Sequence, residues 1–374
     1  VSATRLTQEL RYRAIAIPNL AGQIANALVS IALALAGFGV WALVYALLVA
    51  QVVATGGYIL LRGARFRLML RGDVARPLIS YARHLVSASL LTFLITNIDN
   101  FAVGRLLGDA SLGFYSVAYG FGYLPVSLFS SPAGGALFPS LARIQNNVEV
   151  LRDAYLESFS YAIVLIVPAA IGLSMLAPEI VHILLGPTWA AATLPLLILG
   201  FYGLGRGFVD FSSSLFAAVG KPRIIALQNL YILVLSLILL VPLTISNGIN
   251  GTSVAMTIPV LIVAVVSLRQ SARTLHARIA DFADRLWGPL LAAETMGVLV
   301  YGLRTVMYGL LPARVLIPLL NVNVSEVTIV LLIGIVFGLV VYFGILKYTD
   351  PRVYQGVKHH IGLVIGGLPY LSRD

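Results

Sequence analysis

Two charged residues lie one helical turn apart in an otherwise apolar segment, FYGLGRGFVDFSSS at 201–214. Arg206 and Asp210 would share one face of a helix, because residues four apart are neighbours on its surface. A guanidinium presents a planar pair of N–H donors, which suits bidentate binding of a phosphate group. The spacing therefore predicts either an anion-binding Arg206 or a purely structural Arg206–Asp210 ion pair, and both interpretations stay open.

A second polar cluster interrupts the apolar stretch 90–108, where Asp99 lies between Asn97 and Asn100. A charge at the centre of a bilayer costs about 2.5–3.5 kcal/mol on the insertion scale. We therefore expect Asp99 to face another helix or a water-filled cavity. A hydrogen bond between helices and a position along a substrate path are the two alternatives.

Tyrosines recur at every fourth position after this cluster. Tyr115, Tyr119 and Tyr123 would form one stripe along a helix. Packing is the default interpretation of such a stripe, and a face that stacks on sugar rings is the alternative. The chain has no cysteine, and its five histidines show no ligand spacing, so we expect no catalytic group, no metal and no cofactor.

The elements that carry these residues are predicted to be membrane helices. Hydrophobic residues make up 59% of the chain and charged residues 11%, whereas a soluble domain has about 25% charged residues. A transmembrane helix needs about 20 mostly apolar residues. The sequence thus predicts an all-α, polytopic membrane helix bundle with about ten transmembrane helices, at 14–36, 39–61, 85–107, 112–136, 158–177, 193–219, 224–245, 249–268, 286–308 and 326–346.

The distribution of basic residues predicts the orientation of these helices. Most of the 25 Lys and Arg residues fall in connections that would share one side of the membrane, while Arg105 and Arg314 fall on the opposite side. The basic side is expected to be cytoplasmic, which puts both ends of the chain in the cytoplasm. The net charge of +10 is therefore a topology signal and does not indicate nucleic-acid binding.

The connections between the spans are short. The segment 178–189 is predicted to be a short helix at the outer interface, and the outer connection at 309–325 is about 15 residues long. The stretch 272–287 is predicted to be a basic amphipathic helix at the inner surface, with Leu275 and Phe282 on its apolar face together with Ile279. No outer loop is large enough for a soluble catalytic domain.

Short motifs recur in a fixed order along the chain. They are GFGVWALV at 37–44, VGRLLG at 103–108, SLGFYSVAYGFGYLP at 111–125, LFPSLAR at 137–143, LLGPTWAAATLPLLIL at 184–199, LFAAVGKPR at 215–223 and NGINGTSVA at 247–255. Their order and spacing resemble the polysaccharide transporter branch of the multidrug/oligosaccharidyl-lipid/polysaccharide flippase superfamily. This branch includes O-antigen and exopolysaccharide repeat-unit flippases, and the resemblance covers roughly residues 5–345.

The resemblance implies a fold of two six-helix lobes around a central cavity, often with two further helices. The ten spans would match the last ten of fourteen, so an N-terminally truncated, two-lobed flippase-type fold lacking the first four helices is expected. Residues 1–62 would be the last two helices of the N-terminal lobe, and 63–84 a basic inter-lobe cytoplasmic connection. Residues 85–270 would be the six-helix C-terminal lobe, and 271–374 an amphipathic cytoplasmic segment, two extra helices and a cytoplasmic tail.

The implied function is translocation of lipid-linked oligosaccharide or polysaccharide repeat units across the cytoplasmic membrane by alternating access, without enzymatic activity. The expected substrate is an undecaprenyl-diphosphate-linked, or similar polyprenyl-linked, oligosaccharide. Membrane lipid, a glycan polymerase and export machinery are further expected partners. The expected substrate-path residues are Arg206, Asp210, Asp99, Asn97, Asn100, Tyr115 and Tyr119.

Two other functions are considered. An ion-coupled small-molecule or drug antiporter of the same superfamily could use the carboxylate of Asp99 for proton or sodium coupling. A membrane-embedded glycan polymerase or transferase would need acidic or His groups on sizeable outer loops, and the short predicted loops do not favour it.

Overall fold

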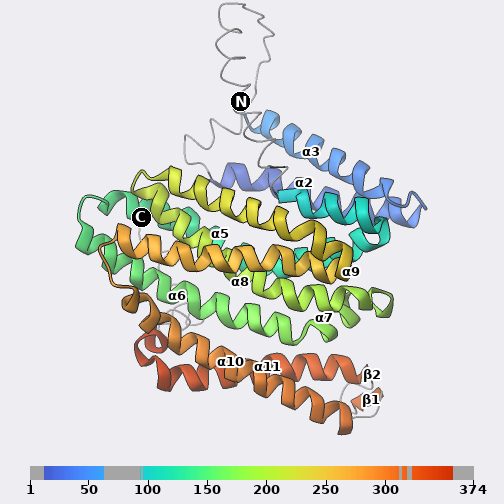
Figure 1. Ribbon diagram of the computed structural model, residues 1–374. Helices are drawn as coiled ribbons and strands as arrows, with labels where there is room; N and C mark the ends of the chain where they lie inside the picture. The colour runs from blue at the N-terminus through green and yellow to red at the C-terminus, as the bar shows by residue number, and fades with distance from the viewer. Residues whose placement is uncertain (1–11, 63–92, 94–95, 311–313, 318–321, 357–374) are drawn as a thin grey trace, which may run out of the picture. The chain divides into compact units, whose positions relative to one another are not determined.

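The computed structural model describes residues 12–62, 93, 96–310, 314–317 and 322–356. The predicted connection at 63–84 and the tail from residue 357 lie outside these ranges. The described elements are shown in Figure 1 and are almost all helical. They are α2 (Tyr12–Leu35), α3 (Trp41–Arg62), a helix at 96–107, α5 (Asp109–Ile144), α6 (Val148–Met175), α7 (Ala177–Leu184), the 3-10 helix η1 (Pro187–Ala192), α8 (Thr193–Ala218), α9 (Pro222–Thr274), α10 (Ile279–Leu310), β1 (Arg314–Ile317), β2 (Val322–Ser325) and α11 (Glu326–Thr349).

The helices agree with the predicted membrane class. Each predicted span overlaps a helix, the third one from residue 96 onward. Within the described ranges, seven helices are long and apolar enough to cross a membrane, by length and composition, and α9 counts as one of them. The chain is therefore a polytopic membrane helix bundle, while the number of ten transmembrane helices stays a prediction.

The chain divides into two compact units, Val1–Ser87 and Ala88–Asp374. The first unit contains the hairpin of α2 and α3, which turns at two glycines with positive φ, Gly37 and Gly39. The two helices approach closely at Gly22, where an added Cβ would lie 2.9 Å from the carbonyl oxygen of Ala50. Small residues let membrane helices pack in this way, because no hydrophobic effect drives them together in lipid.

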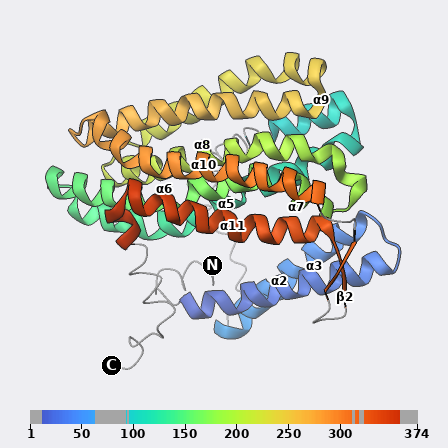
Figure 2. The same ribbon diagram turned by 90° about the horizontal axis from the view of Figure 1, so that it is seen from below.

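The second unit is a bundle in which α8 packs against α5, α6 and α9. Figures 1 and 2 both show these helices running side by side, with α10 and α11 next to α6. Glycines on α8 and α5 allow the close contacts. An added Cβ on Gly205 would lie 3.0 Å from Val260 on α9, and one on Gly122 of α5 would lie 2.8 Å from Leu199 on α8. Helix α8, which contacts α5, α6 and α9, is therefore the central helix of this bundle.

The long helix α9 consists of two helices joined at a kink. Asn247 and Gly248 have non-helical backbone angles there, and Gly248 has a φ of 58°, which glycine adopts without steric cost. Buried hydroxyl groups of Thr244 and Thr252 lie 2.9 Å apart across the turn. The kink separates the two predicted spans at 224–245 and 249–268.

The short segment between α6 and α8 is helical, as predicted. It contains α7 and, after the turn at Gly186, the 3-10 helix η1. Val181 of α7 is buried, because the apolar face of this short helix packs into the bundle. Its position at the outer membrane interface stays a prediction.

The prediction of one amphipathic helix at 272–287 is wrong. Helix α9 ends at Thr274 and α10 begins at Ile279, with a turn between them in which His276 has a φ of 51°. Leu275 and Phe282 are buried, whereas Ile279 is exposed. The turn changes the helical register, so the three apolar residues do not share one face. Phe282 packs against aromatic rings of α6.

The connection between α10 and α11 contains two short strands that the sequence pattern did not predict. Residues Arg314–Ile317 pair antiparallel with Val322–Ser325. The all-α class holds for the bundle, and this hairpin is an addition to it. Each strand has only four residues, which is too short for an alternating pattern to stand out in a sequence.

Candidate substrate site

The predicted ion pair on α8 is present. The Nε atom of Arg206 lies 3.0 Å from Oδ1 of Asp210, and each side chain is 27% exposed. The two residues share one helix face, as the spacing of four predicts. Because each charge has its partner one turn away, the pair can be held inside the bundle with a much lower desolvation penalty than an isolated charge.

A tyrosine from α5 joins this pair from the opposite helix. The hydroxyl of Tyr123 donates to Oδ2 of Asp210 at 3.5 Å. The two carboxylate oxygens therefore have different partners, Arg206 on α8 and Tyr123 on α5. An anion that competes for the guanidinium would leave Asp210 with its tyrosine contact.

Tyr202 is the member of the site that sequence reasoning missed. It precedes Arg206 by one turn on α8, and its hydroxyl oxygen lies 2.8 Å from that of Tyr119 on α5. The two ring centroids are 5.3 Å apart. The spacing of four from Arg206 was a signal that could have found it, because that spacing puts both residues on one face of α8.

The predicted tyrosine stripe on α5 exists and faces α8. The rings of Tyr115 and Tyr119 have centroids 6.2 Å apart, and those of Tyr119 and Tyr123 are stacked at 6.4 Å. Tyr115 is fully buried, while Tyr119 and Tyr123 are partly buried. The stripe therefore packs between helices, and its partly exposed members retain ring surface that a sugar could contact.

The carboxylate of Asp99 is fully buried and bonded between helices. It accepts a hydrogen bond of 2.8 Å from the hydroxyl of Tyr115 and another of 2.8 Å from the backbone N–H of Asn100. Asp99 therefore faces another helix, as expected, because its partner Tyr115 lies on α5. The structure joins Asp99 to the tyrosine stripe, which leads along α5 toward the Arg206–Asp210 pair.

The two neighbouring asparagines differ in their contacts. Asn100 accepts a hydrogen bond of 3.2 Å from Ser116 on α5. Asn97 donates within its own segment, to the carbonyl oxygen of Phe93 at 2.8 Å and to the hydroxyl of Thr96 at 3.2 Å. Asn100 therefore belongs to the contact between the two helices, whereas these hydrogen bonds of Asn97 stay within its own segment and do not reach the tyrosines.

These contacts form one continuous arrangement, which we call the tyrosine ladder. It begins at the buried carboxylate of Asp99, on the helix at 96–107, and ends at the Arg206–Asp210 ion pair on α8. It offers one guanidinium, two carboxylates and four phenol groups, which are groups that bind by charge, hydrogen bonding and ring stacking. Its members are Asp99, Tyr115, Tyr119, Tyr123, Tyr202, Arg206 and Asp210.

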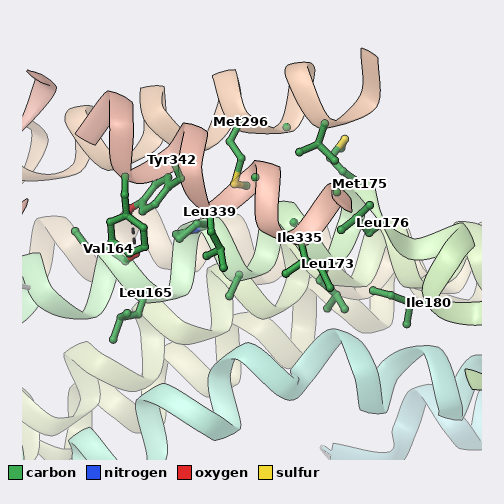
Figure 3. A pocket seen from close by; sticks show the side chains of 18 residues that line it. Val164, Leu165, Leu173, Met175, Leu176, Ile180, Met296, Ile335, Leu339 and Tyr342 are labelled. Atoms are coloured by element: carbon green, nitrogen blue, oxygen red, sulfur yellow. Dashed lines mark hydrogen bonds between the residues drawn. The ribbon is translucent and has the colours of Figure 1, made fainter. Parts of the chain in front are cut away.

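An apolar groove of about 360 Å³ lies between α6, α10 and α11. Figure 3 shows Val164 and Leu165 from α6, Met296 from α10 and Leu339 from α11 around it. The hydroxyl of Tyr342 is not free for a ligand, because it donates to the carbonyl oxygen of Val164 at 3.0 Å. A groove with this lining suits a hydrocarbon chain and has little to bind a polar group.

A second buried ion pair, which the sequence did not reveal, connects α7 to α10. The Nε atom of Arg304 lies 2.7 Å from Oε1 of Glu179, whose side chain is fully buried. The hydroxyl of Tyr308 donates to the same oxygen at 2.9 Å. This pair ties the C-terminal helices to the bundle and lies outside the tyrosine ladder.

Comparison with known proteins identifies relatives that are described as polysaccharide biosynthesis and transport proteins. The family described as polysaccharide biosynthesis protein matches residues 1–194, just over half of the 374 residues. The succinoglycan biosynthesis transport protein ExoT of Rhizobium meliloti is 28% identical over 56% of this chain and 42% of its own length. The lipopolysaccharide biosynthesis protein WzxC of Escherichia coli is 24% identical over 62% of this chain and 48% of its own length.

The similarity extends to archaea and to a solved structure. A probable low-salt glycan biosynthesis flippase, Agl15 of Haloferax volcanii, is 25% identical over 78% of this chain and 58% of its own length. The chain therefore spans about half the length of these curated relatives. The lipid II flippase MurJ, in an inward closed conformation, covers 96% of this chain with a TM-score of 0.67 and 15% identity, and this chain covers 71% of it.

The solved structure supports the fold alone, since its sequence identity is low. The family assignment depends on the sequence match, which includes α2, α3 and the residues of α5 that carry the tyrosine stripe. The chain belongs to the polysaccharide biosynthesis protein family.

Proposed function

We propose that this chain takes part in translocating lipid-linked oligosaccharide or polysaccharide repeat units across the cytoplasmic membrane by alternating access. The observation that carries the proposal is the Arg206–Asp210 pair, which keeps a partly exposed guanidinium in the central helix of the bundle. The names of the relatives add support, because they describe transport and flipping of glycans.

The proposed substrate is an undecaprenyl-diphosphate-linked oligosaccharide or a similar polyprenyl-linked glycan. Its diphosphate would compete with Asp210 for the guanidinium of Arg206, since a phosphate accepts two parallel N–H bonds from the planar fork. The partly exposed rings of Tyr119 and Tyr123 would contact sugars, because aromatic faces offer apolar surface beside a polar hydroxyl. The groove between α6, α10 and α11 has the chemistry for the hydrocarbon part.

The proposed orientation puts both ends of this chain in the cytoplasm. The reason is the accumulation of Arg and Lys in alternate connections, which marks the cytoplasmic side of membrane proteins. Glycan polymerase and export machinery would then meet the transported product on the opposite side of the membrane.

The test of the substrate role is a set of variants at the ion pair. In cells that rely on this protein for glycan export, Arg206→Ala should abolish export at matched membrane levels. Arg206→Lys should keep partial activity, because an ammonium retains the charge and loses the bidentate geometry. Asp210→Ala should be less harmful than Arg206→Ala, since the carboxylate only holds the guanidinium before substrate arrives.

The double variant separates substrate binding from simple structure. If the pair is only structural, Arg206→Ala with Asp210→Ala should recover export, because apolar groups often replace a buried ion pair at little cost. Full export by the double variant would contradict a role for Arg206 in the substrate path.

A dye-efflux assay on the same cells tests the antiporter alternative, in which Asp99→Asn would abolish ion-driven efflux.

A further inference from the structure

A polar pocket of about 680 Å³ lies apart from the tyrosine ladder and the apolar groove. Three segments line it: the first turns of α6, the α9–α10 turn with the start of α10, and the residues that follow α11. The pocket contains four arginines and four aspartates, together with His276. Nothing in the proposed translocation uses these residues.

Arg285 of α10 is held in this pocket by the neighbouring helix. Its Nη1 atom donates to the carbonyl oxygen of Leu156 and to the hydroxyl of Ser160, both at 3.2 Å. A guanidinium has five N–H donors, and these two contacts use only Nη1. Within the described ranges, Arg285 makes no other hydrogen bond or ion pair. The Nε–Nη2 edge, which binds a phosphate with two parallel bonds, therefore keeps its donors.

Two other arginines of the pocket are already neutralised. Arg152 pairs with the adjacent Asp153 at 3.1 Å, and the Nε atom of Arg278 lies 3.7 Å from Asp281. Asp281 also accepts a hydrogen bond of 2.9 Å from the backbone N–H of Arg278. These four residues contribute no net charge for a ligand.

The remaining charges of the pocket lack such partners. Among the residues that the structure describes, neither Arg285 nor Arg352 has a carboxylate within 4.0 Å, and Asp284 forms no ion pair. Asp350 uses one oxygen to cap the backbone N–H of Val353 at 3.2 Å. The pocket thus offers two guanidinium groups, Arg285 and Arg352, and two carboxylates, Asp284 and Asp350, that have no ion pair among the described residues, which suits a zwitterionic ligand with a phosphate and a hydrogen-bond donor.

Two exposed aromatic residues near the pocket are what we expect of a rim at the level of lipid headgroups. Trp287, two residues after Arg285, is 65% exposed, and Tyr348, next to the pocket residue Thr349, is 79% exposed. Exposed Trp and Tyr residues at helix ends gather at the membrane–water interface. A phospholipid at that depth would present its headgroup to the pocket while its acyl chains stay in the bilayer.

We propose that this pocket binds the headgroup of a phospholipid. Arg285 and Arg352 take the phosphate, and Asp284 accepts from an N–H or O–H donor such as the ammonium of ethanolamine. This site is independent of the proposed transport function, because it uses none of the residues of the tyrosine ladder.

The test is native mass spectrometry of the purified chain with added lipid. Phosphatidylethanolamine should remain bound, and phosphatidylcholine should bind about tenfold more weakly, since its quaternary ammonium has no N–H for Asp284. Arg352→Gln should weaken phosphatidylethanolamine binding by about tenfold, the usual effect of losing one charge-assisted hydrogen bond. Arg273→Gln is the matched control, because Arg273 is exposed on α9 and does not line the pocket.

Three results would overturn the proposal. The first is equal binding of the two lipids, and the second is unchanged binding by Arg352→Gln. The third is displacement of the lipid by soluble phosphoethanolamine at equal concentration, which would indicate a site for a free phosphate ester. Arg352 is exposed, so its replacement should leave the thermal midpoint unchanged. Arg285→Lys provides a second variant that keeps the charge and removes the two-donor edge, and it should also lose lipid.

Discussion

The hydroxyl oxygens of Tyr119 on α5 and Tyr202 on α8 lie 2.8 Å apart, and this contact links the tyrosine stripe to the helix that carries Arg206. The two residues are 83 positions apart in the chain. The pair fixes the distance between the two helices at the level of the ion pair, so its loss should be measurable both in stability and in export.

Tyr119→Phe should destabilise the protein by about 0.5–2 kcal/mol, because it leaves the buried hydroxyl of Tyr202 without its partner. Tyr202→Phe should have a similar effect. The double variant should lose less than the sum of the two, since neither hydroxyl is then left alone. Thermal unfolding of the purified variants measures this, and strictly additive losses would contradict the hydrogen bond.

Gly122→Ala should destabilise the contact between α5 and α8 by about 1–3 kcal/mol, the usual effect of overpacking. An added Cβ at this position would lie 2.8 Å from both Cβ and the carbonyl oxygen of Leu199. Gly120→Ala is the matched control on the same helix, because nothing lies within 4 Å of its added Cβ. The control should be neutral or slightly stabilising, since alanine favours a helix. Equal thermal midpoints for the two variants would count against the close approach.

Leu339→Trp should lower glycan export without lowering membrane levels, if the groove between α6, α10 and α11 takes the hydrocarbon part of the substrate. Leu339 lines the groove and is partly exposed, so the larger side chain can occupy it. Val336→Trp is the control, because Val336 is exposed on the same helix and is not part of the lining. Equal export by both variants would contradict a role for the groove in the substrate path.

Ser246→Cys should react with a membrane-impermeant maleimide in intact cells, and Ala283→Cys should not. Both positions are exposed, and the chain has no cysteine of its own. Ser246 precedes the α9 kink on the predicted outer side, and Ala283 lies in the first turns of α10 on the basic side. The reverse labelling pattern would invert the orientation proposed for the whole chain.

The sequence predicted the parts of this structure that depend on local spacing or on membrane thickness. Arg206 and Asp210 pair because four residues make one helical turn, which any helix of this sequence would produce. Long apolar helices were predictable because a bilayer requires about 20 apolar residues for each crossing, while their number as membrane spans stays a prediction. Both rules apply before any tertiary contact is known.

Contacts between distant segments could not be predicted in the same way. Asp99 needed a partner and Tyr115 was part of a stripe, but nothing in the sequence indicated that they bond to each other. Glu179 and Arg304 also come together only through packing of α7 against the C-terminal helices. The turn after Thr274 has no proline or glycine to mark it, and a helical pattern therefore continued across it without a visible break.

Helix α10 is fixed to its neighbours at two levels. Arg285 donates to the backbone and to Ser160 of α6 near one end, and Arg304 pairs with Glu179 of α7 toward the other. Nineteen residues separate the two arginines, about 28 Å along a helix, which is close to the thickness of the hydrocarbon layer. Because these two contacts hold α10 to α6 and to α7 at points that far apart, we expect any sliding or tilting of α10 to displace α6 and α7 with it.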